Sequence, residues 1–145
     1  MSSFLFLDVN VWLALTSSRH AHNAAAVQWW DSIGDAQVYF CRFTQVGLLR
    51  LLTTPQVMGE DVVSQNEAWT AYRRWFKDPR VGFHQEPDPP ELERRFHRFS
   101  MGPHPSPKLW ADAYLAAFAS VAGLTLVTFD RALGAMTPGR ALILS

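Results

Sequence analysis

The stretch that decides the fold is Phe4-Leu5-Phe6-Leu7-Asp8-Val9-Asn10-Val11-Trp12, an apolar run that ends at a carboxylate and continues with helical spacing. Four consecutive apolar residues are typical of a short strand that is covered on both faces, as in a parallel sheet. A second stretch has the same design, because the apolar run 124–129 ends at Asp130 and a helical pattern follows. Both stretches therefore predict a strand followed by a helix, with an aspartate at the junction.

Strand and helix patterns alternate along the whole chain. Strands are predicted at 4–7, 37–41, 80–84, 125–128 and 141–144. Helices are predicted at 9–17, 22–32, 44–53, 64–77, 87–100, 109–122 and 132–136. Alternating elements with buried strands favour a three-layer α/β/α fold with a mainly parallel sheet. No repeat or linker divides the chain, so residues 1–145 are predicted to form a single domain.

The composition is that of a folded protein with no strong overall field. The 145 residues are 48% hydrophobic and 13% aromatic, and the formal net charge is zero, so any phosphate contact must come from a local patch. The single Cys41 excludes an intrachain disulfide and a cysteine-based zinc site. Asp8 stands where a signal peptide would continue apolar, and the longest apolar stretch, 113–129, is interrupted by Ser120 and Gly123. We therefore expect a cytoplasmic protein without a membrane span.

Asp112 is a third carboxylate in apolar surroundings. It lies in the predicted helix 109–122, whose side chains are otherwise almost all apolar, and such a helix is expected to be buried. A buried carboxylate is costly unless it neutralises or finds a positive partner. Asp8 and Asp130 are expected at the carboxyl ends of strands, where parallel sheets bind ligands. Three such carboxylates predict a hard divalent cation, Mg²⁺ or Mn²⁺, although helix capping is an alternative role for Asp8 and Asp130.

Four short motifs, in this order, resemble those of a known nuclease family. They are LDVNVW at 7–12, TQVGLLRLLT at 44–53, WADAYL at 110–115 and VTFDR at 127–131. Together they resemble the PIN-domain nucleases, and most closely the VapC-type toxins of VapBC toxin–antitoxin systems. The resemblance covers essentially the whole chain. It implies a five-stranded parallel sheet, an acidic site for Mg²⁺ or Mn²⁺, cleavage of RNA, and inhibition by a small antitoxin.

The resemblance also assigns site residues. Asp8, Asp112 and Asp130 match the acidic positions of the family, so they are expected to hold the metal and to be catalytic. The remaining acid of the family, usually a glutamate on the third helix, falls on Gln45. Gln45 can offer a carbonyl oxygen or bind a metal-held water, but it adds no negative charge. Weaker metal binding is therefore expected.

Three functional hypotheses follow. The leading one is a divalent-metal-dependent endoribonuclease that acts as the growth-inhibiting toxin of a toxin–antitoxin pair, with RNA as substrate and a homodimer as the expected assembly. The alternative, which Gln45 favours, is a catalytically weak PIN domain that binds RNA or protein. A phosphoryl-transfer enzyme with Asp8 as nucleophile is disfavoured, because Asn10 stands where haloacid dehalogenase-type enzymes carry a second aspartate.

Other polar and aromatic groups have less specific patterns. Arg94, Arg95 and Arg98 are expected to form a solvated helix face, with phosphate contact as the alternative. His104, in a proline-rich loop, is a candidate for lining a substrate path. The tryptophans of the first two helices are expected in the core or, where exposed, at a dimer or antitoxin surface; they are Trp12, Trp29 and Trp30.

Overall fold

The sheet is the central layer of the molecule. The computed structural model describes residues 3–145, and its five strands form one sheet in the order β3-β2-β1-β4-β5 with every neighbouring pair parallel. The strands are β1 (Phe4–Leu7), β2 (Gln37–Phe40), β3 (Val81–Phe83), β4 (Thr125–Thr128) and β5 (Ala141–Ile143). The predicted α/β fold with a five-stranded parallel sheet is confirmed.

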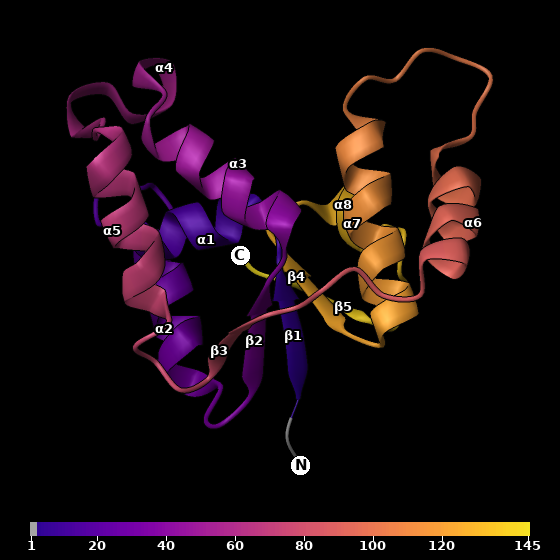
Figure 1. Cartoon of the computed structure of the whole chain (residues 1–145), viewed down its shortest axis with the longest axis horizontal. Helices are drawn as coiled ribbons and strands as arrows, with labels where there is room; N and C mark the ends of the chain where they lie inside the picture. The colour runs from indigo at the N-terminus through magenta and orange to yellow at the C-terminus, as the bar shows by residue number, and fades with distance from the viewer. Residues whose placement is uncertain (1–2) are drawn as a thin grey trace.

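Helices cover both faces of the sheet (Figure 1). One face carries α1 (Val9–Thr16), α2 (Asn23–Ser32), α3 (Arg42–Leu52), α4 (Pro55–Met58) and α5 (Gln65–Trp75). The other carries α6 (Pro89–Ser100), α7 (Leu109–Ala122) and α8 (Arg131–Ala135). Within the described part of the chain, no helix is long and apolar enough to cross a membrane.

The predicted bounds lie within two residues of the observed ones, and two differences have a clear physical cause. The third helix begins two residues early, at Arg42, because the Cys41 N–H donates a hydrogen bond to Thr44 Oγ1 at 2.9 Å and so caps the first turn. The segment after the third helix, where no helix is predicted, is also helical from Pro55 onward. Pro55 starts the short helix α4, since proline is favoured in the first turn of a helix, and a 3₁₀ turn, η1 (Gly59–Asp61), follows.

Alternate side chains of β1 enter separate cores. Leu5 and Leu7 pack with the α1, α2, α3 and α5 side, whereas Phe6 packs with α6, α7 and α8. In the first core Trp12 stacks on Phe40 with ring centroids 3.8 Å apart. In the second, Phe6 stacks on Phe118 at 4.7 Å. Strands buried on both faces explain the continuous apolar runs in the sequence.

The tryptophans of α1 and α2 belong to the first core. Trp12 is fully buried, Trp30 is 7% exposed, and Trp29 packs against them while partly buried. Their rings meet those of Trp75 and of one another at steep angles. The core interpretation is therefore confirmed for Trp12 and Trp30, and neither can form part of an exposed partner surface.

The strand order reverses at β1, which lies between β2 and β4. Leu7 at the end of β1 pairs with Val127 near the end of β4, and the Asp8 N–H donates to the Val127 carbonyl at 2.9 Å. The loops that follow these two strands must diverge to opposite sides of the sheet. A crevice forms at such a point, outside the carboxyl ends of the strands.

Candidate active site

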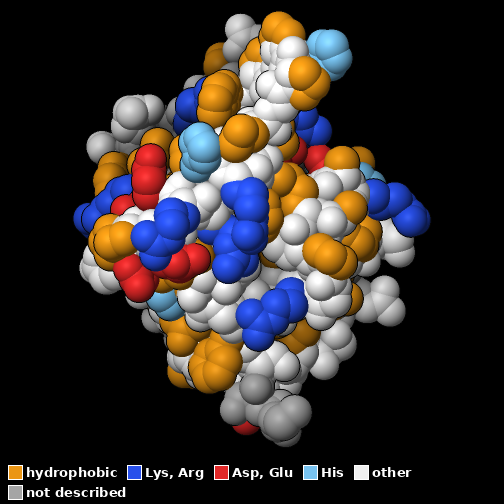
Figure 2. Space-filling view, turned by 90° about the vertical axis from the view of Figure 1, so that its right-hand side faces the viewer, with side chains coloured by type: hydrophobic (Ala, Val, Ile, Leu, Met, Phe, Trp, Pro, Cys, Tyr) orange, Lys and Arg blue, Asp and Glu red, His pale blue; other side chains and the backbone are white. Residues whose placement is uncertain are grey.

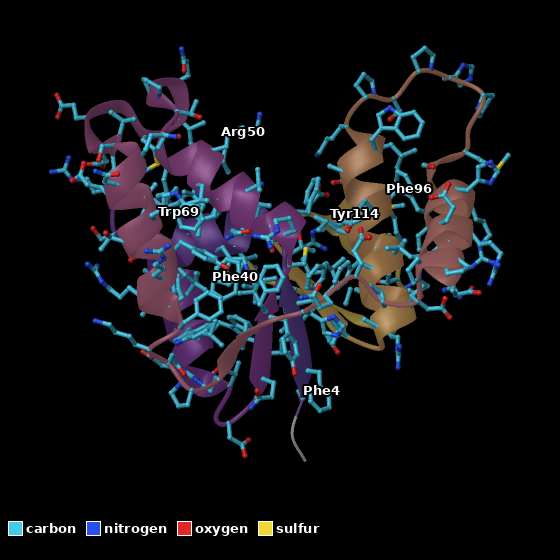
Figure 3. The ribbon with its side chains drawn as sticks, viewed as in Figure 1. Phe4, Phe40, Arg50, Trp69, Phe96 and Tyr114 are labelled. Atoms are coloured by element: carbon cyan, nitrogen blue, oxygen red, sulfur yellow. The ribbon has the colours of Figure 1, made fainter. Side chains whose placement is uncertain are left out.

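A cavity of about 350 Å³ lies at this strand reversal, between α3 and α7. The lining comes from the segments that follow β1 and β4, which carry Asp8 and Asp130, from the start of α1, from one stripe of α3, and from the first two turns of α7 with the segment before them. Arg50, labelled in Figure 3, marks the α3 side. The residues that line the cavity are Asp8, Val9, Asn10, Phe43, Gly47, Arg50, Leu51, Pro107, Lys108, Ala111, Asp112, Leu115 and Asp130. The three aspartates singled out in the sequence therefore face one space.

Asp8 is the most buried of the three. Its side chain is held by Thr128, whose hydroxyl donates to Asp8 Oδ2 at 2.9 Å. Burial raises the pKa of Asp8, and the negative charges of Asp112 and Asp130 act in the same direction, while the Thr128 hydrogen bond opposes them. Asp8 makes no capping hydrogen bond from its side chain to α1. Its carboxylate is held at the cavity by the hydroxyl of Thr128, at the end of the neighbouring strand β4.

Asp130 both caps a helix and lines the cavity. Its Oδ1 accepts hydrogen bonds from the N–H groups of Ala132 at 2.9 Å and Leu133 at 3.2 Å, so it caps α8. Its Oδ2 accepts from Lys108 Nζ at 3.0 Å. The Lys108 ammonium lowers the pKa of Asp130. One oxygen of this carboxylate therefore serves the fold, and the other faces the cavity.

Asp112 lies in the first turn of α7, and here the structure corrects the expected burial. Trp110 is 60% exposed and Asp112 is partly buried, so the fully buried part of the helix lies between Ala113 and Ala119. Burial still raises the pKa of Asp112, with opposition from Lys108 and support from Asp130. Lys108 stands one helical turn before Asp112 and approaches both carboxylates. It is the positive partner that apolar surroundings require.

Gln45 is not among the residues that line the cavity. It is 5% exposed, and its Oε1 accepts a hydrogen bond from Arg42 at 2.6 Å. Gln45 and Gly47 are two positions apart on α3 and are therefore separated by about 200° around the helix axis. The face of α3 that lines the cavity carries Gly47 and not Gln45. A Cβ on Gly47 would lie 2.7 Å from a Val9 methyl group. Direct participation of Gln45 in this cavity is thus not supported.

The cavity contains groups that the sequence analysis did not assign to the site. Arg50 and Lys108 add positive charge, and Asn10 adds an amide. Two signals were available in the sequence. Gly47, Arg50 and Leu51 share a helical stripe, and Lys108 precedes Asp112 by one turn.

The donor chemistry fits a hard divalent cation, although the side chains are not already assembled around one point. Within residues 3–145 no three His, Cys, Asp or Glu side chains form a ready-made metal cluster. Three carboxylates nevertheless line one cavity, and their negative charge is partly balanced by Lys108. Carboxylate oxygens of this kind suit Mg²⁺ or Mn²⁺. The metal role of Asp8, Asp112 and Asp130 stays a prediction.

Known proteins of similar sequence and fold agree with this architecture. The PIN-domain family model matches residues 5–137. The chain is 42% identical over 132 residues to Ribonuclease VapC41 of Mycobacterium tuberculosis, covering 88% of this chain and 90% of that protein. The crystal structure of Mycobacterium tuberculosis VapC20, described as a sarcin–ricin loop cleaving toxin, superimposes with a TM-score of 0.64 at 18% identity, covering 90% of this chain and 93% of that one.

A further structural neighbour is VapBC2 from Rickettsia felis, solved bound to a DNA fragment from its promoter. It matches with a TM-score of 0.69 at 9% identity over 98% of this chain and 99% of that one. Identities this low establish the fold, whereas the match to Ribonuclease VapC41 and to the family model establishes kinship. The chain belongs to the PIN-domain family and, within it, to the VapC ribonucleases.

Proposed function

We propose that this protein is a cytoplasmic, divalent-metal-dependent endoribonuclease that acts as the toxin of a toxin–antitoxin pair. The observation that carries the proposal is the convergence of Asp8, Asp112 and Asp130 on one cavity at the strand reversal of a VapC-family fold. The cavity is open to solvent and is flanked by the cationic side chains of Arg50 and Lys108. Such a combination of acidic and basic groups suits a phosphodiester substrate.

Each residue has a distinct proposed role. Asp8, Asp112 and Asp130 would hold Mg²⁺ or Mn²⁺. When bound, such a cation supplies water activation and stabilises the charge that develops on a reacting phosphate. Arg50 is placed to contact a phosphate oxygen through its guanidinium. Thr128 keeps Asp8 oriented by its hydrogen bond, and Lys108 partly balances the negative charge through its ion pair with Asp130.

Two protein partners are proposed: a small antitoxin, from the similarity to a VapBC complex, and a second copy of this chain, from one exposed apolar surface. The Rickettsia felis neighbour is a VapBC complex, and we propose a small antitoxin for this chain as well. A shallow apolar groove lies between α3 and α5, lined by Val46, which is 53% exposed, and Trp69, which is 41% exposed (Figure 3). Exposed apolar side chains at this level are typical of a partner surface. We propose this groove as the contact of a homodimer.

The test is RNA cleavage by Asp8→Asn with Mn²⁺ or Mg²⁺. The substitution keeps the side-chain size and the Thr128 contact but removes the charge, so we expect activity to fall at least about 100-fold, as loss of metal-site groups does. Asp35→Asn is the matched control, because Asp35 is exposed in the turn before β2, at the opposite edge of the sheet. Full activity of Asp8→Asn, with a normal thermal unfolding profile, would falsify the assignment.

A catalytically weak domain that binds RNA is the second candidate. It is favoured by the presence of only three carboxylates among the described residues that line the cavity, one of them paired with Lys108. Highly purified protein that binds RNA in Mn²⁺ without cutting it would establish this candidate. Gln45→Glu is expected to restore nothing, because Gln45 does not line the cavity and its side chain is bound to Arg42.

A further inference from the structure

A second cavity adjoins the first one. It has a volume of about 560 Å³ and lies beneath the loop 101–108, between the end of α6 and the start of α7. Figure 1 shows this loop rising beyond both helix ends. Pro107 lines both this cavity and the aspartate cavity. A flexible chain that occupies the aspartate cavity can therefore continue directly into the second one.

The lining of the second cavity combines one exposed aromatic face with hydrogen-bonding groups. Trp110 is 60% exposed, and its ring is supported by Phe96, with ring centroids 6.3 Å apart. His97, His104 and Ser106 contribute donors and acceptors around it. Aromatic rings that stack on a base, together with polar groups that meet the base edge, are how proteins bind unpaired nucleotides. The volume is also in the range of about 300–1,000 Å³ that small-ligand sites occupy.

The charge around this cavity selects its occupant. None of the described residues that line it is Asp or Glu. Lys108 adjoins it on one side, and Arg98 is exposed on α6, whereas Arg94 is paired with Glu91 at 2.6 Å. Figure 2 views the α6 face and shows Lys and Arg side chains below a projecting top that carries hydrophobic and His side chains. A lining without carboxylates and with a cationic neighbour favours a negatively charged backbone over a basic peptide.

We propose that this second cavity is a nucleotide-binding subsite, in which Trp110 stacks on an unpaired base of a single-stranded RNA beside the scissile phosphate. The inference deepens the proposed function, because the same RNA strand reaches the three aspartates. Trp110 is a binding and specificity residue. It acts on the ground state and the transition state alike, so its loss raises KM and leaves kcat nearly unchanged.

The first test is binding of a short, fluorescein-labelled single-stranded RNA in EDTA, measured by anisotropy. Trp110→Ala is expected to weaken binding about tenfold, the effect of losing one base–aromatic stack, and Trp110→Phe to lose less because a ring remains. Phe4→Ala is the matched control. Phe4 is also an exposed aromatic, 49% exposed, but it lies at the amino end of β1, far from both cavities (Figure 3). Equal affinity of Trp110→Ala and the wild type overturns the proposal.

The second test needs no substitution. Wild-type protein is irradiated with the same RNA carrying 5-iodouracil, and the crosslinked peptide is identified by mass spectrometry. A crosslink at Trp110 or at the loop 101–108 supports the subsite, and a crosslink confined to the α3–α5 groove overturns it. A Trp110→Ala protein that binds RNA normally but changes its oligomeric state, or loses a protein partner, assigns the surface to a protein and also overturns it.

These outcomes separate the subsite from the nuclease assignment. A wild-type protein that cuts no RNA but binds it through Trp110 retains the subsite and refutes the activity. Conversely, a wild-type protein that cuts RNA, with Trp110→Ala showing unchanged KM and unchanged cleavage-site preference, retains the activity and refutes the subsite.

Discussion

At the scale of single residues, the three aspartates share one cavity but not one environment. Asp8 is buried and held by Thr128, Asp112 is half-buried on a helix, and Asp130 is divided between a helix cap and Lys108. Burial raises the pKa of Asp8 and of Asp112, whereas the Lys108 ion pair lowers that of Asp130. Three identical side chains therefore have pKa values that are shifted in different directions by their surroundings, and the local sequence does not reveal these shifts.

Lys108 competes with a metal for the same oxygens. Its ammonium lies 3.0 Å from Asp130 Oδ2, and both side chains of the pair reach solvent. We expect Lys108→Gln to lower the dissociation constant for Mn²⁺ about twofold to fivefold, because an exposed ion pair contributes up to about 1 kcal/mol. Isothermal titration calorimetry measures the change. Lys77→Gln serves as the control, because Lys77 is exposed in the turn that follows α5. Weaker Mn²⁺ binding by Lys108→Gln alone would contradict competition.

At the scale of secondary structure, most elements follow from local pattern. The apolar runs of β1 and β4 and the long apolar helix α7 are predicted with nearly their observed bounds, because burial on all sides leaves an unambiguous signature. Ser64 and Glu67 likewise cap α5 by mutual hydrogen bonds of about 3 Å. The start of α3 and the α4–η1 segment depend on capping and on packing, and these boundaries differ from the predicted ones.

Arg80 joins the turn between α5 and β3 to the end of α2 and the loop after it. Arg80 is bound to Asp78 at 2.8 Å, donates to the carbonyls of Trp30 and Gly34, and lies 4.6 Å from the centre of the Trp30 ring. The Arg80 hydrogen bond lowers the pKa of Asp78. A lowered carboxyl pKa contributes stability above its unfolded value of about 4, and this contribution is lost as pH falls through the folded value.

We therefore expect Asp78→Asn to reduce the free energy of unfolding by about 1 kcal/mol at neutral pH. The difference from the wild type should shrink as pH falls from about 4 through the lowered pKa of folded Asp78, because below that value both proteins carry a neutral side chain at this position. Urea unfolding at several pH values measures it, with Asp35→Asn as the control for loss of an exposed carboxylate. A difference that is constant across this pH range would show that the charge of Asp78 is not what stabilises the turn.

At the scale of the whole molecule, sheet topology assembles the cavity from segments far apart in sequence. The reversal of strand order at β1 brings the residue after β1 beside the end of β4, and the first turn of α7 packs over the same edge. Mutual repulsion of the three carboxylates is a destabilising consequence of this convergence. A bound cation removes it and binds only the folded state, so it also stabilises the fold.

Thermal unfolding tests this coupling. At a Mn²⁺ concentration about 100 times the dissociation constant, the wild-type Tm is expected to rise by about 5–10 °C, as a gain of about 2.7 kcal/mol implies. Asp112→Asn should unfold at a higher temperature than the wild type in EDTA, because one repelling charge is gone, and should respond less to Mn²⁺. Asp35→Asn should behave as the wild type in both conditions. An undiminished Mn²⁺ response in Asp112→Asn would remove Asp112 from the proposed metal site.

The sequence by itself determined the fold class, the family, and the two strand-end aspartates, because buried parallel strands and the turns that end them leave local patterns. Tertiary structure alone decided which other groups share the site. Gln45 and Gly47 are two residues apart, yet helix α3 turns Gln45 toward Arg42 and Gly47 toward the cavity. Lys108, Arg50 and the cavity beside Trp110 likewise depend on how α3, α6 and α7 pack over one sheet edge. Contacts between distant segments have no local signature, so packing selects the neighbours of the aspartates.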